Sequence, residues 1–155
     1  MSEAREVMLN EIRYAERLCT RTARLYKRAQ TVGVFVSIVS GSAVMSSLSA
    51  DCPRWLSIAA LVVLAVFGAA LIAIRPAEKA TVNEADAKRY AQLRTNAAQL
   101  DDDGLRAAIA KAHEGDVAEV EPLRDVAYND VVREVGRPDL ATPLRPTQRL
   151  LAALA

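Results

Sequence analysis

The sequence has few of the residues that most often carry chemistry. Of its 155 residues only one is histidine and two are cysteine, and 5% are aromatic. A single histidine leaves no histidine-based metal cluster, and two cysteines on either side of an apolar block make no disulfide framework. Sparse aromatic side chains provide no platform for stacking bases. The composition therefore predicts a protein without a metal or another cofactor.

An excess of charge of either sign is also missing. The formal net charge is +1, whereas a protein that binds a nucleic acid polymer needs many more lysines and arginines than acids. The sequence contains no glycine-rich phosphate loop and no nucleophile motif. His113, the single histidine, is interpreted as a helix-surface residue. We therefore expect neither a nucleic-acid-binding protein nor an enzyme.

Charge is nearly absent from the middle of the chain, where a long stretch contains only Asp51 and Arg54. This stretch holds two uncharged runs, each close to the roughly 20 residues that a helix needs to cross a membrane. The connector between them is too short for anything but the turn of a hairpin. The sequence predicts a first transmembrane helix over residues 29–50, an external turn over 51–54 and a second transmembrane helix over 55–75.

The distribution of basic residues predicts the orientation of this hairpin. Several lysines and arginines lie shortly before the first run and shortly after the second, whereas the turn contains Arg54 alone. Cytoplasmic flanks are enriched in such residues, so both termini are predicted to be cytoplasmic, with the protein in a bacterial inner membrane. A cleaved signal peptide is the alternative for the first run, but the glutamates that precede it do not fit the short basic start of a signal.

The segment before the first run, residues 1–28, is predicted to be a cytoplasmic helix. It contains neither glycine nor proline, and its small or apolar residues follow a heptad spacing typical of a helix that packs against another. The natural partner is the returning cytoplasmic helix, residues 76–100, which begins with a proline and has helical spacing of its own. The predicted seam consists of Met8, Ile12, Ala15, Cys19, Thr22, Tyr26 and Ala29.

Residues 101–155 are predicted to form C-terminal cytoplasmic helices and a tail. Asp101 reads as an acidic N-cap, Gly115 as the C-cap of the helix that follows, and Pro122–Val135 as another helix closed by a glycine. Docking of the short amphipathic tail on the bundle, or its use for a partner or a membrane surface, are both open. The predicted fold is an all-α membrane protein: a two-helix transmembrane hairpin with long cytoplasmic extensions and a small C-terminal helical bundle.

Arginines line one face of the N-terminal helix at spacings of three and four residues. They are interpreted as a solvated face that ends near anionic lipid headgroups, or as a contact for an anionic nucleotide or an acidic patch. Residues Asp101 to Asp139 include eleven acids and five bases, so they can pair with this face within or between chains. The arginine stripe consists of Arg13, Arg17, Arg21, Arg24 and Arg28.

Small and polar residues form a second stripe, on the first predicted transmembrane helix. Such residues allow close approach of another helix, here the second span, and they also tolerate water. They therefore predict either helix packing or a lumen, and a lumen requires homo-oligomerisation because two helices cannot enclose a pore. The small-residue stripe consists of Gly33, Ser37, Ser40, Gly41 and Ser47.

The order of these elements resembles that of a known family. An arginine-bearing helix enters a two-span hairpin, a helix returns, and residues 127–130 (Ala-Tyr-Asn-Asp) are followed by residues 136–139 (Gly-Arg-Pro-Asp). This arrangement is similar to the SLATT family of prokaryotic two-transmembrane effectors. The resemblance implies a pore-forming effector of bacterial antiphage or conflict systems and no catalytic residue. Tyr128 and Asn129 match the family motif, with helix capping, core packing and ligand binding all open for them.

Two functions are expected from these observations. The first is a homo-oligomeric pore that depolarises the inner membrane and is gated by a signal at the cytoplasmic helices. The alternative is a non-conducting membrane anchor or scaffold that recruits a cytoplasmic partner. The expected partners are membrane lipid and other copies of the chain, and for the pore also a nucleotide second messenger or a nucleotide-sensing protein.

Overall fold

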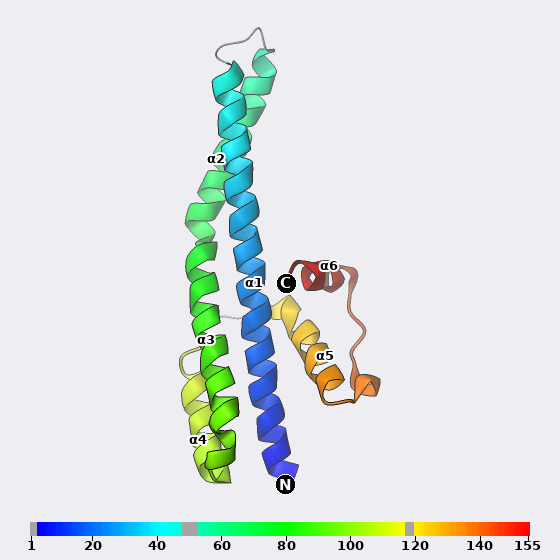
Figure 1. Ribbon diagram of the computed structural model, residues 1–155. Helices are drawn as coiled ribbons and strands as arrows, with labels where there is room; N and C mark the ends of the chain where they lie inside the picture. Colours follow the sequence, from blue (N-terminus) through cyan, green and yellow to red (C-terminus); the bar gives the residue numbers. More distant parts are fainter. Residues whose placement is uncertain (1–2, 48–52, 117–119) are drawn as a thin grey trace. The chain divides into compact units, whose positions relative to one another are not determined.

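The computed structural model describes residues 3–47, 53–116 and 120–155, and within these ranges every regular element is a helix (Figure 1). The prediction of an all-α fold is confirmed for this part of the chain. The main helices are α1 (Glu3–Ser47), α2 (Arg54–Ile74), α3 (Pro76–Asn96), α4 (Asp102–His113), α5 (Arg124–Glu134) and α6 (Pro146–Leu154). Three short 3₁₀ helices, η1 (Ala97–Gln99), η2 (Glu121–Leu123) and η3 (Pro138–Leu140), lie between them.

The chain divides into two compact units. The first, which we call the bundle, contains residues 1–25 and 80–155, and the second, which we call the hairpin, contains residues 26–79. Both α1 and α3 contribute to each unit. Residues 26–28 and 76–79, which the sequence places in the cytoplasmic helices, belong to the hairpin, and α1 contributes to both units as one unbroken helix.

In the bundle, α1 packs against α3 and α4 along the seam that its heptad spacing predicts. Ile12 of α1, Tyr90 of α3 and Leu105 of α4 are fully buried in this core. Burial of a large apolar side chain stabilises a fold by about 1.5–3 kcal/mol. Helices α1 and α3 are thus partners, as predicted. The core consists of Met8, Ile12, Ala15, Cys19, Tyr90, Ala97, Leu105, Ile109 and Ala112.

A second core lies on another side of α1 and was not predicted. Leu18 of α1, 1% exposed, packs with Leu123 of η2 and Val126 of α5. Leu151 and Ala152 of α6 are partly buried against the same cluster. The sequence leaves two roles open for the tail, and the structure shows the first: α6 docks on the chain's own bundle.

The ends of the bundle helices agree with the sequence at two positions. The Asp101 carboxylate accepts a hydrogen bond from the backbone N–H of Gly104 at 2.9 Å, so the predicted N-cap is confirmed. After α5, Gly136 has a left-handed backbone with φ of 77°, and the N–H of Arg137 donates to the carbonyl of Val132. Glycine is favoured there because a side chain strains this conformation.

The prediction for Gly115 is wrong. Glu114 is the C-cap residue of α4, and among the described glycines only Gly136 has a positive φ. A Cβ atom on Gly115 would lie 2.6 Å from Nη1 of Arg89. The glycine therefore makes room for an arginine side chain instead of reversing the backbone. The helix predicted over Pro122–Val135 is also shorter than expected, because η2 precedes α5.

The hairpin contains the two helices that are long and apolar enough to cross a membrane. Many of their large side chains are exposed: Phe35 is 66% exposed, Trp55 68% and Ile72 77%. Helix α2 ends at Ile74, Arg75 has a left-handed backbone with φ of 49°, and α3 starts at the proline that follows. Of the predicted external turn, residues 51 and 52 lie outside the described residues, Pro53 directly precedes α2, and Arg54 is the first residue of α2.

Candidate functional site

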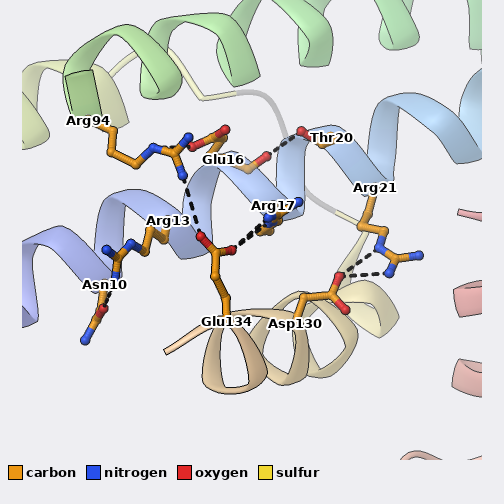
Figure 2. Close-up of polar contacts among 9 residues, drawn as sticks. All are labelled: Asn10, Arg13, Glu16, Arg17, Thr20, Arg21, Arg94, Asp130 and Glu134. Atoms are coloured by element: carbon orange, nitrogen blue, oxygen red, sulfur yellow. Dashed lines mark hydrogen bonds and ion pairs between the residues drawn. The ribbon is translucent and has the colours of Figure 1, made fainter. Parts of the chain in front are cut away.

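The arginine stripe of α1 meets acidic side chains of α5 (Figure 2). Nη2 of Arg17 lies 2.7 Å from Oε2 of Glu134, and Nη2 of Arg21 lies 2.9 Å from Oδ2 of Asp130. The two arginines are one helical turn apart, and so are the two acids, so the spacing of charge matches between the helices. Basic and acidic segments that are distant in the sequence therefore pair within one chain.

Glu134 also joins a third helix to this contact. Nη1 of Arg94, on α3, lies 3.8 Å from Oε1 of Glu134, and Nε of Arg94 lies 3.3 Å from Oε2 of Glu16 (Figure 2). One carboxylate thus lies between two arginines of different helices. We call this set the ion-pair network; it consists of Glu16, Arg17, Arg21, Arg94, Asp130 and Glu134.

The members of the network differ in exposure. The side chain of Arg17 is 44% exposed, whereas those of Arg21 and Asp130 are 24% and 22% exposed. Arg21 also donates to the backbone carbonyl of Ala152 in α6, at 3.1 Å. Exposed ion pairs contribute about 0.2–1 kcal/mol each, and hydrogen bonds to charged groups contribute more when they are shielded from water. Arg21 is therefore the stronger contact, and it holds both α5 and α6.

The contact between Arg17 and Glu134 shifts the pKa of both groups. The hydrogen bond from Arg17 lowers the pKa of Glu134 below its ordinary value of 4.5, although partial burial opposes this shift. The same hydrogen bond raises the pKa of Arg17. Because the pKa of Glu134 is lower in the folded state, its contribution to stability is present above the ordinary pKa and is lost as the pH falls through the lowered value.

We expect acid to loosen α5 for this reason. Below pH 4.5, the rate of amide hydrogen exchange in α5, relative to the intrinsic rate at the same pH, should increase more in the wild type than in Glu134→Gln. The variant has no carboxylate to protonate at that position. Hydrogen exchange measured by mass spectrometry on both proteins across this range tests the prediction. An identical pH dependence in the two proteins would contradict it.

The rest of the arginine stripe does not form one continuous contact. Arg13 donates to Oδ1 of Asn10 on its own helix at 3.0 Å. Arg24 is exposed, and Arg28, also exposed, belongs to the hairpin. Within the stripe, Arg17 and Arg21 are the residues that form ion pairs with α5.

Asn129 of the family-like motif is a structural clamp. It is 3% exposed; its Nδ2 donates to the carbonyl of Thr142 at 2.8 Å, and its Oδ1 accepts from the N–H of Thr142 at 2.7 Å. The amide thereby ties the segment between η3 and α6 to α5. Tyr128 is 39% exposed and lines a groove of about 570 Å³ between α1 and α5. Of the two motif residues, only Tyr128 is accessible to a ligand.

We expect Asn129→Ala to reduce the free energy of unfolding by about 2 kcal/mol, since it removes both hydrogen bonds between the buried Asn129 amide and the backbone of Thr142. Tyr128→Phe should change it by less than about 0.5 kcal/mol, as surface substitutions usually do. Chemical denaturation followed by circular dichroism in detergent measures both. Equal stability of the two variants would contradict the clamp.

Two further residues organise the bundle and were not predicted. Arg5 donates to the carbonyl of Leu100 at 2.9 Å and pairs with Asp102 at 2.7 Å, so it holds the turn between α3 and α4 against α1. The hydroxyl of Tyr90 donates to Asp116 at 2.5 Å. Burial, and then this carboxylate, raise the pKa of Tyr90. Neither contact has a signal in the sequence, because each joins residues that only the fold brings together.

The small-residue stripe lies in the hairpin and divides into covered and open positions. A Cβ atom on Gly33 would lie 2.6 Å from Cδ2 of Leu71, so α1 and α2 touch there. Ser40 is 8% exposed, and Oγ of Ser37 is buried without a hydrogen bond to the described residues. Gly41 faces open space, with nothing within 4 Å of a Cβ position. The side chain of Ser47 lies outside the described residues.

The described residues contain no group of three or more histidine, cysteine, aspartate or glutamate side chains that could hold a metal ion. The features that stand out are therefore the ion-pair network in the bundle and the apolar hairpin. No protein-family model, no curated protein and no solved structure matches the chain.

Proposed function

We propose that the protein is a homo-oligomeric, pore-forming effector of a bacterial inner membrane, with both termini in the cytoplasm. The apolar surface of the hairpin carries this proposal. Phe35, Ile38 and Ile72 are each more than 60% exposed, on helices of sufficient length to cross a bilayer. A continuous apolar surface of this kind is costly in water and favourable in lipid. The basic residues at one end of the hairpin favour the cytoplasmic side for that end.

The pore part of the proposal rests on the open part of the small-residue stripe. Packing of α2 leaves Gly41 facing open space, and the neighbouring Ser42 is exposed. A second copy of the chain can approach closely at these positions, and a ring of copies can enclose water along them. A lumen lined by glycine and serine, without rings of charge, discriminates poorly among small ions. Such a pore dissipates the membrane potential, as the resemblance to SLATT effectors implies.

The bundle supplies the site for the signal. Arg17 and Arg21 hold α5 against α1, and α1 continues into the hairpin as one helix. An anionic ligand such as a nucleotide second messenger, or an acidic surface on a nucleotide-sensing protein, competes for these guanidinium groups. Displacement of α5 is then the event that changes the assembly of the hairpins.

Cysteine accessibility tests the lumen directly. In a background with Cys52→Ser and with the buried Cys19 retained, Gly41→Cys places a thiol on the open face of α1. Phe35→Cys is the matched control, because Phe35 is 66% exposed on a different face of the same helix. In membranes of cells that express the chain, a charged, membrane-impermeant thiol reagent should modify Gly41→Cys and not Phe35→Cys. Failure to modify Gly41→Cys, or equal modification of both, would count against a water-filled lumen.

The second candidate is a non-conducting anchor, and one observation favours it. Gly33 and Ser40 are covered by packing within a single hairpin. Helix packing alone therefore accounts for the small residues at these two positions. In an anchor, Gly41 faces lipid or a dry contact with another helix. The reagent should then leave both cysteine variants unmodified, although the protein is inserted in the membrane.

A further inference from the structure

The groove between α1 and α5, about 570 Å³ in volume, is an open apolar surface of the bundle. Valines of α5 line it, and two of them, Val131 and Val132, are each only 5% exposed. Other lining residues are more open, since Val7 of α1 is 62% exposed and Leu140 of η3 is 48% exposed. Exposed apolar side chains around a groove of this kind are typical of a surface that receives the apolar face of a helix.

The α1 side of this groove is acidic. Glu6 and Glu11 both line it, and both are exposed. Arg137, which also lines it, pairs with Asp139 at 3.2 Å. A helix that fits the groove should therefore have an apolar face with a basic side chain beside it.

Helix α6 has such a face, directed away from its own bundle. Leu151 is partly buried against the second core. On the opposite face Leu150 and Leu154 lie one helical turn apart and are 64% and 43% exposed. Arg149 is exposed beside them, and residues 141–155 contain two arginines and no acidic side chain. The outer face of α6 is thus apolar and basic, whereas the groove is apolar and acidic.

We infer that the outer face of α6 docks in the α1–α5 groove of a second copy of the chain. Leu150 and Leu154 enter the groove, and Arg149 lies near the acidic side chains of α1. Each chain holds its own α6 by the inner face, so the helix that fills a groove comes from another copy. The inference rests on the homo-oligomer of the proposed function, and it adds the cytoplasmic contact that joins the subunits.

The dimensions of helix and groove also agree. Helix α6 is nine residues long, about 13 Å. The residues of α1 that line the groove extend from Glu6 to Tyr14, about 12 Å along that helix. Because the groove and the outer face of α6 are different surfaces, the contact is head-to-tail, and successive contacts form a ring where the rotation closes. Helix α5 is one wall of the groove, so its displacement also removes the contact.

Cross-linking between two differently tagged, full-length chains tests this contact. Both chains contain Cys52→Ser and retain the buried Cys19. One has Val7→Cys in the groove, and the other has Ala153→Cys on the outer face of α6. A short bifunctional thiol reagent, applied to membranes that contain both chains, should join this pair roughly tenfold more often than the control pair. The control pair is Arg106→Cys with Ala153→Cys, since Arg106 is 68% exposed on α4 and is not among the lining residues.

A reversal of charge in each chain shows whether the two surfaces recognise each other. Arg149→Glu in the chain with Ala153→Cys should lower the yield roughly fivefold, because repulsion replaces an exposed ion pair. Glu6→Arg with Glu11→Arg in the chain with Val7→Cys should then restore the yield. An unchanged yield after Arg149→Glu, or no recovery after the second reversal, would overturn the contact.

Co-purification through the two tags separates this contact from the proposed function. Equal yields for the test pair and the control pair, or no cross-link, in chains that co-purify would overturn the contact and leave the groove to a partner other than this chain. The homo-oligomer would then depend on other contacts. Chains that do not co-purify from membranes would overturn the homo-oligomer, and the α6 contact with it.

Discussion

Charge reversal at Arg17 and Arg21 is expected to detach α5 and α6 from α1. Each substitution by glutamate removes an ion pair with α5 and places two carboxylates together, at Glu134 and at Asp130. The loss should be roughly 2 kcal/mol in the free energy of docking, since exposed pairs contribute about 0.2–1 kcal/mol and repulsion of similar size replaces them. Hydrogen exchange should show faster exchange in α5 and α6, with α1 and α3 little changed.

The matched control and the rescue make this prediction specific. Arg24→Glu changes the charge by the same amount at an exposed position of the same helix, and it should leave exchange in α5 unchanged. Adding Asp130→Arg and Glu134→Arg to the Arg17→Glu, Arg21→Glu protein should restore part of the protection, because opposite charges then face each other again across the α1–α5 contact, whereas Arg94 then faces a like charge at position 134. Full protection of α5 in the Arg17→Glu, Arg21→Glu protein, or no recovery after the second reversal, would contradict the role of the network.

If α5 is the element through which a signal acts, the Arg17→Glu, Arg21→Glu protein should also differ from the wild type in function. Membrane insertion should be unchanged, because neither Arg17 nor Arg21 belongs to the hairpin. The formation of oligomers, or its regulation by the signal, should change. Chemical cross-linking in membranes measures the amount of oligomer. Wild-type assembly and wild-type activity in the Arg17→Glu, Arg21→Glu protein would separate the ion pairs from signalling, although their structural role would stand.

Ile12→Ala is expected to reduce the free energy of unfolding of the bundle by about 3 kcal/mol. Ile12 is 0% exposed and lies in the core that joins α1 to α3 and α4, where the removed methyl groups leave a cavity. Val7→Ala, at a position that is 62% exposed on the same helix, should change stability by less than about 0.5 kcal/mol. Chemical denaturation followed by circular dichroism compares the two. A loss below about 1 kcal/mol for Ile12→Ala would show that this seam is not the main core.

The seam could be predicted because it depends on local periodicity. The heptad spacing of α1 identifies Ile12 without knowledge of its partner, and the hairpin between the spans then predicts that α3 returns beside it. Leu18 could not be identified in the same way. It packs against α5 and α6, and a helix with two partners has a second buried row that the first pattern conceals. Periodicity indicates a buried face but not how many neighbours cover it.

The site could be predicted in outline only. Opposite net charges at the two ends of the chain indicate that the segments can pair, and Arg17 and Arg21 are among the candidates. The choice of Glu134 and Asp130 as their partners depends on the docking of α5, which no local pattern specifies. Core packing is one of the roles that the sequence leaves open for Asn129, but its partner Thr142 is fixed only by the fold. The prediction for Gly115 is wrong for the same physical reason, since the contact of Gly115 with Arg89 also depends on a tertiary neighbour.

The membrane potential of cells that express the full chain tests the central claim most directly. A potential-sensitive dye should report depolarisation at expression levels at which cross-linking detects oligomers in the inner membrane, because a ring of hairpins with open small-residue positions conducts small ions. Phe35→Cys, on the exposed apolar face, should depolarise as the wild type does. An unchanged potential in cells whose membranes contain the oligomer would contradict the pore and leave the anchor as the function of this hairpin.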